Sequence, residues 1–228
     1  MKRHNKARKA IELSAVIILA SAILGACAEN VQKQKIPAAT YMGGKASITG
    51  ICKELDAAGA SHVDLFQEWV VDFADSAGKN AKLEDAWSDP AKMKAVKCMD
   101  GWEQNHDYSD ADCRMTAFLL LDGMLCSEST EGNYTGTYLM FDTEAIDNVD
   151  RYEIIKKNRD MFTTLYGEKR VTEGSSPETV FSDSWKYHGF QINSDRISLL
   201  SIVIYDPYSE VVFVGHTGIL IKYSDYYL

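Results

Sequence analysis

The segment Arg114–Cys126 (RMTAFLLLDGMLC) is apolar almost all the way round when it is drawn as a helix. A helix without a polar face is stable only when other elements surround it. The segment therefore predicts a buried central helix. The remaining residues must supply its cover, and a chain of 228 residues is long enough to form one such domain.

Other parts of the first two thirds of the chain also carry apolar residues at helical spacing. Four further helices are expected: Ile48–Ala58 ending at Gly59, a second one capped by Ser61, a third running from Asp89-Pro90 toward Trp102, and Tyr152–Tyr166. The polar segment 78–88 is expected to be a loop.

After Pro177 the chain becomes rich in Ile, Val, Phe and Tyr, and turn residues such as Asp206-Pro207 break it into short segments. Strands are expected at Trp185–Ile192, Ile197–Tyr205, Glu210–His216 and Gly218–Tyr223, and also at Thr137–Phe141. A chain whose first part forms helices and whose last part forms strands is typical of an α+β domain. The sequence thus predicts one α+β domain over 47–228, with N-terminal helices and the buried helix packed on a C-terminal antiparallel sheet.

The N-terminus has the organisation of an export signal. Basic residues within Lys2–Lys9 precede the uncharged segment Leu13–Leu24, whose twelve residues are fewer than the roughly 20 that span a bilayer. The next residues, Leu24–Cys27 (LGAC), resemble the lipobox of bacterial lipoproteins. We therefore expect a signal peptide at 1–26, a lipid on Cys27 and a flexible tether over 27–46, which would anchor an exported domain to the cell membrane.

Charge and motif content exclude several classes of function. The formal charge of −9 argues against nucleic acid as a partner, because an acidic surface repels phosphate. The sequence lacks the GxSxG, P-loop, GxGxxG and HExxH patterns, and no cofactor is expected. His106-Asp107 with Asp110 and Asp112 lacks the spacing of a calcium loop, so a solvated acidic loop is favoured over a metal site.

Four cysteines remain besides Cys27, namely Cys52, Cys98, Cys113 and Cys126. Outside the cell they could form two disulfides in one of three pairings. A single helix over Arg114–Cys126 would hold Cys113 and Cys126 about 20 Å apart, too far to pair with each other.

Cys113 is the candidate nucleophile, since the start of a buried helix stabilises a thiolate. The adjacent Asp112 opposes this by raising the thiol pKa, unless its carboxylate caps the helix. His216 is the candidate base because it lies between glycines in an apolar strand segment, although a packed core histidine is the commoner alternative. His62, His106 and His188 are interpreted as solvated or packed residues.

Asp112-Cys113 before an apolar helix, followed by Gly215–Ile219 on a strand, is similar to the Cys and His halves of NlpC-like cysteine peptidases of the papain-like superfamily. A closer resemblance, spanning most of 47–228, is to a bacterial lipoprotein family called domain of unknown function 4300. Its pattern resembles Cys113–Phe118, Trp185-Lys186 and Phe213–Ile221.

The resemblance implies a papain-like fold and mechanism, in which Cys113 attacks an amide carbonyl and His216 accepts the thiol proton. Gln104 is a candidate second oxyanion donor or else a solvated residue at a helix end, and Arg114 could bind a substrate carboxylate or pair with a nearby Asp. Because the family pattern continues past the His strand, we expect either a truncated C-terminus or an orienting group other than Asp225.

Two functions follow from these observations. The first is a membrane-anchored thiol amidase or peptidase that acts on peptide or peptidoglycan amide bonds of the cell envelope. The second is a non-catalytic surface lipoprotein with a binding or structural role, in which Cys113 is structural and His216 is packed. Aromatic residues of the C-terminal half, such as Tyr187 and Tyr208, would then line a binding face or simply form strands.

Overall fold

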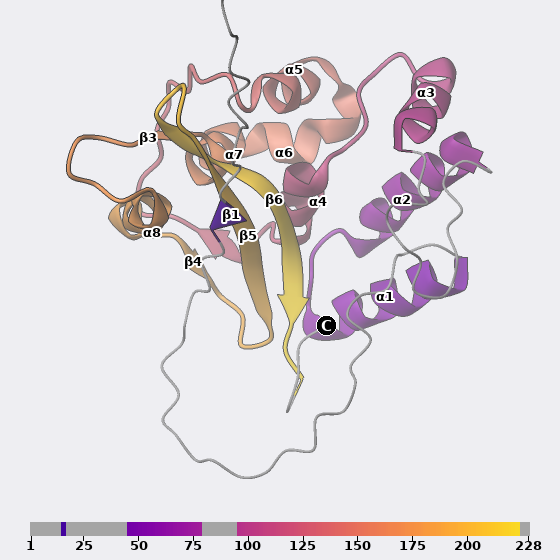
Figure 1. Ribbon diagram of the computed structural model, residues 1–228. Helices are drawn as coiled ribbons and strands as arrows, with labels where there is room; N and C mark the ends of the chain where they lie inside the picture. The colour runs from indigo at the N-terminus through magenta and orange to yellow at the C-terminus, as the bar shows by residue number, and fades with distance from the viewer. Residues whose placement is uncertain (1–14, 17–44, 79–94, 224–228) are drawn as a thin grey trace, which may run out of the picture.

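The computed structural model describes residues 15–16, 45–78 and 95–223. Its helices are α1 (Lys45–Ala58), α2 (Val63–Ala77), α3 (Ala95–Asn105), α4 (Cys113–Leu120), α5 (Met140–Asn148), the 3₁₀ helix η3 (Asp150–Tyr152), α6 (Glu153–Lys157), α7 (Arg159–Tyr166) and α8 (Pro177–Tyr187). Its strands are β1 (Ala15–Val16), β2 (Leu125–Cys126), β3 (Lys169–Arg170), β4 (Gln191–Ile192), β5 (Ile197–Asp206) and β6 (Val211–Ile221). This combination of helices with antiparallel strands confirms the α+β class (Figure 1).

Several predicted features lie outside the described residues. They are most of the signal peptide, Cys27, nearly all of the tether, the loop at 79–88, the helix start at Asp89-Pro90, and Asp225. Within the part of the chain that the structure describes, no helix is both long enough and apolar enough to cross a bilayer.

The main sheet is built on an antiparallel hairpin of β5 and β6, and its strand order is β1-β5-β6-β3. β5 confirms the expected strand at Ile197–Tyr205, and the turn after it contains Pro207. The two strands expected at 210–216 and 218–223 are wrong as separate elements, because β6 runs through Thr217 without a break. A second sheet consists of β2 and β4 alone.

A bulge at Gly215 divides β6 into two halves. Val214 pairs with Val203, whereas His216 pairs with the preceding residue Ile202, so Gly215 is the additional residue on β6. A bulge of this kind shifts the alternation of side chains by one position. The buried positions are therefore Val212 and Val214 before the bulge and Thr217 after it.

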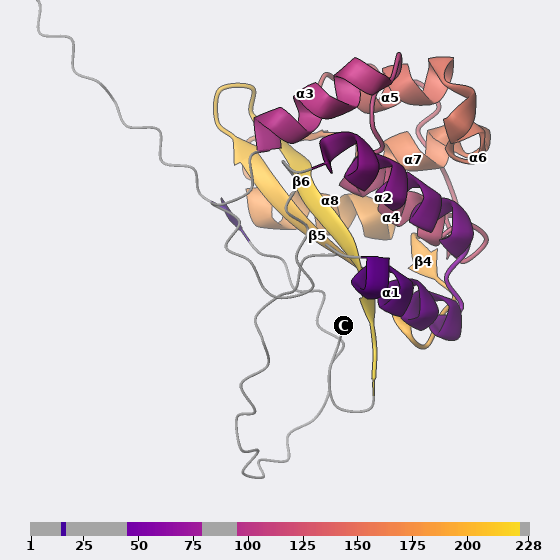
Figure 2. The same cartoon turned by 90° about the vertical axis from the view of Figure 1, so that its right-hand side faces the viewer.

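One face of the β5–β6 hairpin packs on helices. In Figure 2, α1, α2 and α4 all lie to one side of the hairpin. Between the sheet and the surrounding helices lies a core in which the Phe118 and Phe162 rings meet edge to face at 5.3 Å, and those of Phe162 and Tyr166 at 5.2 Å. Leu119 and Leu121 are fully buried, which confirms that the segment after Cys113 is central to the domain.

The prediction of one helix over Arg114–Cys126 is wrong in length. α4 ends at Leu120, and the chain then turns through Gly123 at φ +74°. A glycine adopts this left-handed conformation without steric cost, so the turn can form inside the apolar segment. Leu125 and Cys126 consequently pair with β4 instead of continuing the helix.

Three other predicted elements are corrected. The expected strand at Thr137–Phe141 leads into α5, and the expected helix at Tyr152–Tyr166 is divided among η3, α6 and α7. Of the strand expected at Trp185–Ile192, only the last two residues form a strand, β4. The first residues belong to α8, where Phe181 and Trp185 lie on the packed side of the helix. Aromatic residues suit strands and helix faces alike when they are buried.

The start of α2 also differs from the prediction. Its N-cap position is held by His62 at φ 51°, not by Ser61. The Ser61 hydroxyl instead donates a hydrogen bond to the backbone oxygen of Asp122 at 2.5 Å. The end of α1 at Gly59, by contrast, agrees with the sequence, since Gly59 has φ +88°.

Candidate functional site

Cys113 is the first residue of α4, and Asp112 is its N-cap. The Asp112 carboxylate accepts hydrogen bonds from the backbone N–H groups of Arg114 and Met115, each at 2.9 Å. This satisfies two amides that a helix start leaves unpaired. It also keeps the Asp112 charge close to the Cys113 thiol.

Arg114 connects the start of α4 to two other elements. Its Nε and Nη2 atoms donate to the two Asp142 oxygens at 2.9 and 2.8 Å, and Nη1 donates to the Val214 carbonyl at 3.0 Å. Nη2 also lies 2.7 Å from Asp112. Although burial alone would lower the pKa of Arg114, these carboxylates raise it, so the guanidinium stays charged. Of the two alternatives for Arg114, the structure shows pairing with an Asp.

The thiol of Cys113 is half-buried, and its environment favours the neutral form. Burial raises the pKa of Cys113 above its ordinary value, and the Asp112 charge raises it further. A backbone hydrogen bond from Thr217 and the Arg114 charge lower the pKa, but they do not outweigh the first two effects. The expected stabilisation of a thiolate by the helix start is therefore overcome by burial and by Asp112.

His216 and Thr217 lie on opposite faces of the β5–β6 hairpin, and Thr217 is the one that faces Cys113. His216 is exposed and sits opposite Ile202, whereas its neighbour Thr217 is buried and sits opposite Ser201. The Thr217 hydroxyl lies 3.0 Å from the Ser201 hydroxyl and donates to the Leu200 carbonyl at 2.9 Å. The structure thus brings Thr217, and not His216, to Cys113.

The Gly215 bulge accounts for this arrangement. Without it, simple alternation from Val212 and Val214 would place His216 on the buried face beside α4. The additional residue moves Thr217 to that position instead. The alternative of a packed core histidine is also wrong for His216, because its side chain is exposed.

Cys113 borders a cavity of about 230 Å³ between α1, α2, α4 and β6. The cavity is lined mainly by apolar side chains: Ile51, Leu55, Phe66, Ala117, Leu120 and Ile219, with Cys113, Thr116, Thr217 and Gly218. Its two hydroxyls have partners in the fold, since Thr116 donates to the Asp112 carbonyl at 2.9 Å and Thr217 to that of Leu200 at 2.9 Å. The cavity therefore offers an apolar group contacts on several sides but few free hydrogen bonds.

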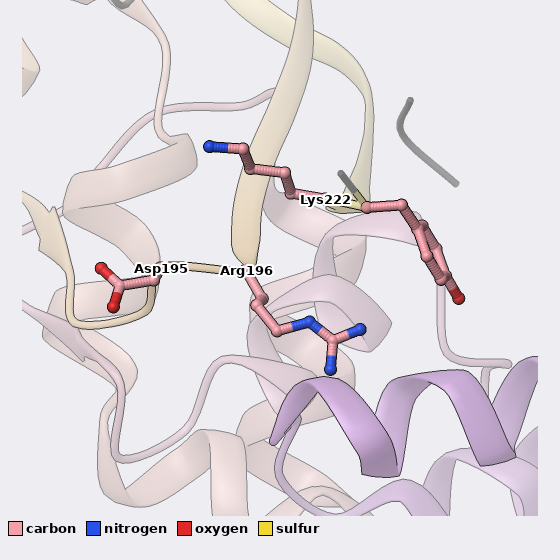
Figure 3. A pocket seen from close by; sticks show the side chains of 4 residues that line it. Asp195, Arg196 and Lys222 are labelled. Atoms are coloured by element: carbon pink, nitrogen blue, oxygen red, sulfur yellow. The ribbon is translucent and has the colours of Figure 1, made fainter. Parts of the chain in front are cut away.

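A second hollow, of about 390 Å³, lies at the ends of β5 and β6 beside Asp195, Arg196, Lys222 and Tyr223. Arg196 donates to the Ala57 carbonyl at 2.5 Å, and its guanidinium stacks 5.8 Å from the Tyr223 ring. Figure 3 shows the Lys222 side chain extending away from the Arg196 guanidinium. The two cations do not converge, so this hollow has no shared anion site.

The remaining candidates of the sequence have structural partners. His62 lies 2.7 Å from Asp122, and His106 stacks on the Trp102 ring at 3.6 Å and pairs with Asp72 at 3.2 Å. Gln104 is exposed on α3. Among the described residues, no group of three or more His, Cys, Asp or Glu side chains is arranged to hold a metal ion.

The cysteines of the described chain are all free thiols, so none of the three disulfide pairings is formed. Cys52 and Cys98 are buried, Cys113 is half-buried and Cys126 is exposed. Sequence reasoning missed Asp142, the buried partner of Arg114, because an acidic residue within a short helix carries no local signal of burial. It also missed the contact between His188, Ser129 and Glu131, which are distant in sequence.

The chain matches a known protein family. The sequence model of a family described as domain of unknown function 4300 matches residues 40–228. No curated protein and no solved structure matches the chain.

Proposed function

The chain belongs to this family, domain of unknown function 4300, and we propose that it is an exported lipoprotein whose domain binds an apolar group beside Cys113. The observation that carries the proposal is the cavity of about 230 Å³ between α1, α2, α4 and β6. In this function Cys113 lines the binding site and does not act as a nucleophile. Burial is the main reason why the pKa of its thiol is raised, and a thiol that stays neutral agrees with that role.

The lining indicates the chemistry of the ligand. The hydroxyls of Thr116 and Thr217 are used within the fold, so a polar ligand would lose its hydrogen bonds to water without replacement. The volume is slightly below the roughly 300–1,000 Å³ of sites for drug-sized molecules. A short alkyl chain or one aliphatic side chain of a larger partner suits this space.

Binding is tested with 1-hexanol as the probe, by following backbone amide signals of the full chain in NMR. We expect saturable shifts at Ala117 and Ile219, which line the cavity. Ala117→Leu should abolish them by filling the cavity, whereas Leu220→Ala, a change outside the lining, should leave them unchanged. Linear, unsaturable shifts in the wild-type protein, or unchanged binding by a folded Ala117→Leu variant, would refute the proposal.

Membrane attachment through Cys27 completes the proposed function. It rests on the basic N-terminus, the short apolar segment Leu13–Leu24 and the LGAC residues that end at Cys27. Two acyl chains anchor a protein stably, whereas a single chain binds the membrane only marginally. A diacylated Cys27 would therefore hold the domain at the membrane surface.

This part is tested by growing a bacterial host with an alkyne-bearing fatty acid and detecting the label on the chain. Cys27→Ala should lose the label. Cys126→Ala, which removes an exposed thiol of the folded domain, is the matched control and should keep it. Retention of label by Cys27→Ala would show that the lipid is elsewhere.

A thiol amidase acting on envelope peptides is the second candidate function, and the position of Cys113 at both the start of α4 and the edge of a cavity favours it. In this function the Cys113 sulfur attacks the amide carbonyl and His216 moves inward to accept the proton. Incubation with peptidoglycan peptides should then produce new amino termini, detected by mass spectrometry, that Cys113→Ser does not produce. Equal product from both proteins would reject this candidate.

A further inference from the structure

Ser129, His188 and Glu131 form a hydrogen-bonded chain separate from the Cys113 cavity. The Ser129 hydroxyl lies 3.0 Å from His188 Nδ1, and His188 Nε2 lies 3.1 Å from a Glu131 oxygen. Ser129 and Glu131 belong to the irregular segment after β2, whereas His188 follows α8. The fold therefore assembles a hydroxyl, an imidazole and a carboxylate from two distant parts of the chain.

The charge on Glu131 fixes the protonation of the imidazole. Partial burial alone would raise the pKa of Glu131, but hydrogen bonds from Lys169, at 3.1 Å, and from His188 lower it below its ordinary value. An ionised carboxylate only accepts hydrogen bonds, so Nε2 of His188 carries a proton. In the neutral ring Nδ1 is then the acceptor, and the Ser129 hydroxyl donates to it.

The imidazole is held firmly while the hydroxyl stays accessible. His188 is only 4% exposed. Its backbone oxygen accepts hydrogen bonds from the Ser127 hydroxyl at 2.7 Å and the Glu128 N–H at 2.9 Å. Ser129 itself is exposed. A fixed base next to an accessible hydroxyl is the arrangement that an activated serine requires.

Two neighbouring groups extend this arrangement. The backbone N–H of Thr130 makes no hydrogen bond to any residue in the described ranges, so it is free to donate to a developing oxyanion. The ring of Tyr187, 80% exposed, lies edge-on to His188 at 5.0 Å between centroids. It offers an exposed apolar surface next to the imidazole to which Ser129 is hydrogen-bonded, and the acyl part of a substrate could pack there.

We propose that Ser129, His188 and Glu131 form a second site, at which Ser129 is acylated by carboxylic esters and then regenerated by water. The Ser129 oxygen bonds to the ester carbonyl carbon as its proton passes to His188 Nδ1. The C–O bond to the alcohol breaks, and the alcohol leaves with that proton. Water, deprotonated by His188, then attacks the acyl group, releases the carboxylic acid and returns the proton to Ser129.

The setting of Ser129 selects the class of ester. Among the residues that the structure describes near the His188 imidazole, only the Tyr187 ring is largely exposed, while the Phe190 ring is half-buried. This setting suits a short acyl group on an accessible alcohol, because one exposed ring covers little of a long chain. Esters also need less assistance at the leaving group than amides do. This activity is independent of apolar binding beside Cys113, whose cavity is lined by other elements.

The test uses the full chain in detergent with a biotinylated fluorophosphonate, which phosphonylates activated serines, followed by peptide mass spectrometry. We expect the label on Ser129, at a rate at least 100-fold above that of Ser129→Ala. Ser175→Ala is the matched control, since Ser175 is an exposed serine whose hydroxyl donates to the Thr172 carbonyl and to no residue of this site, and it should keep the full labelling. A wild-type label that maps elsewhere, or no label above that of the denatured chain, would overturn the proposal, whether or not Ser129→Ala folds.

Glu131 is a positioning residue in this site, and its test needs a conservative variant. Glu131→Gln should slow phosphonylation by about 10- to 100-fold because it no longer fixes the proton on Nε2. Glu131→Asp keeps the negative charge and should recover a substantial part of the rate. Equal rates in the wild type and a folded Glu131→Gln variant would contradict the assigned role of the carboxylate.

Discussion

Arg114 and Asp142 form a two-point ion pair, with Nε to Oδ1 at 2.9 Å and Nη2 to Oδ2 at 2.8 Å, that joins the start of α4 to α5. The Asp142 side chain is only 3% exposed and that of Arg114 is 16% exposed. Burial and the neighbouring Asp112 charge raise the pKa of Asp142, whereas its two hydrogen bonds with Arg114 favour the ionised form. Because both charges of the pair are largely removed from water, either one left alone would be costly. Arg114, which directly follows Cys113 in the sequence, therefore has a structural role.

Asp142→Asn should lower the free energy of unfolding by about 3 kcal/mol, since Arg114 would lose its buried counter-charge. The matched control is Asp147→Asn. Arg159 also binds Asp147 through two atoms, at 2.6 and 2.9 Å, but the Asp147 side chain is 40% exposed. The control should cost less than about 1 kcal/mol. Urea unfolding of both variants measures the difference, and equal losses would contradict the structural role of Arg114.

Gly101 marks a close approach of α3 to α2. A Cβ atom there would lie 2.6 Å from the backbone oxygen of Ser76, whereas a Cβ at Gly50 in α1 would meet nothing within 4 Å. Gly101→Ala should therefore destabilise the domain by about 1–3 kcal/mol. Gly50→Ala should stabilise it by about 0.5–1 kcal/mol, because alanine favours the helix. Thermal unfolding of the two variants should show shifts of opposite sign.

Asp110 is predicted to make stability depend on pH. Burial raises its pKa to about 6, against about 3.9 in an unfolded chain. A raised carboxyl pKa means that the fold favours the protonated form. The stability it contributes is present below about pH 4 and is lost as the pH rises to about 6.

Asp110→Asn should accordingly stabilise the domain by about 1–2 kcal/mol at pH 7.5, a value reduced from the full linkage because Asp110 is partly exposed. At pH 4 the effect should be much smaller, since both proteins are then neutral at this position. Unfolding at the two pH values checks this, and an equal effect at both would show that the charge of Asp110 is not involved.

The four described thiols should differ in reactivity in the order of their exposure. Cys126 is exposed, Cys113 is half-buried, and Cys52 and Cys98 are 4% and 1% exposed. Burial also raises the pKa of Cys52 and of Cys98. Alkylation of the native chain, read by peptide mapping, should modify Cys126 first, Cys113 next and the other two only on unfolding. Cys113 reacting ahead of Cys126 would indicate an activated thiol.

Local signals in the sequence predicted the features that depend on neighbouring residues. Gly59 ends α1, Asp112 is in place to cap α4, and the turn at Pro207 separates β5 from β6. Each of these follows from backbone geometry within a few residues. The α+β class followed likewise from the order of helical and strand patterns.

Features set by distant residues could not be predicted in this way. The turn at Gly123 lies inside an apolar segment, and only the pairing of β2 with β4 shows why the helix stops before it. The bulge at Gly215 depends on register with β5, and it decides which of His216 and Thr217 faces α4. The expected Cys113–His216 pair required His216 to face α4, and the register of β6 leaves it on the exposed face instead.

The central structural result is that Cys113 meets Thr217 while His216 is exposed on the opposite face of the hairpin. The most direct test is the rate at which iodoacetamide modifies Cys113 between pH 5 and 9, in the wild type and in His216→Ala. The arrangement predicts a rate that rises about tenfold with each pH unit from pH 5 to 9 and reaches no plateau, because burial raises the thiol pKa. The same profile is expected for His216→Ala. A plateau of fast labelling below pH 7 that disappears in His216→Ala would contradict it and establish a Cys113–His216 pair.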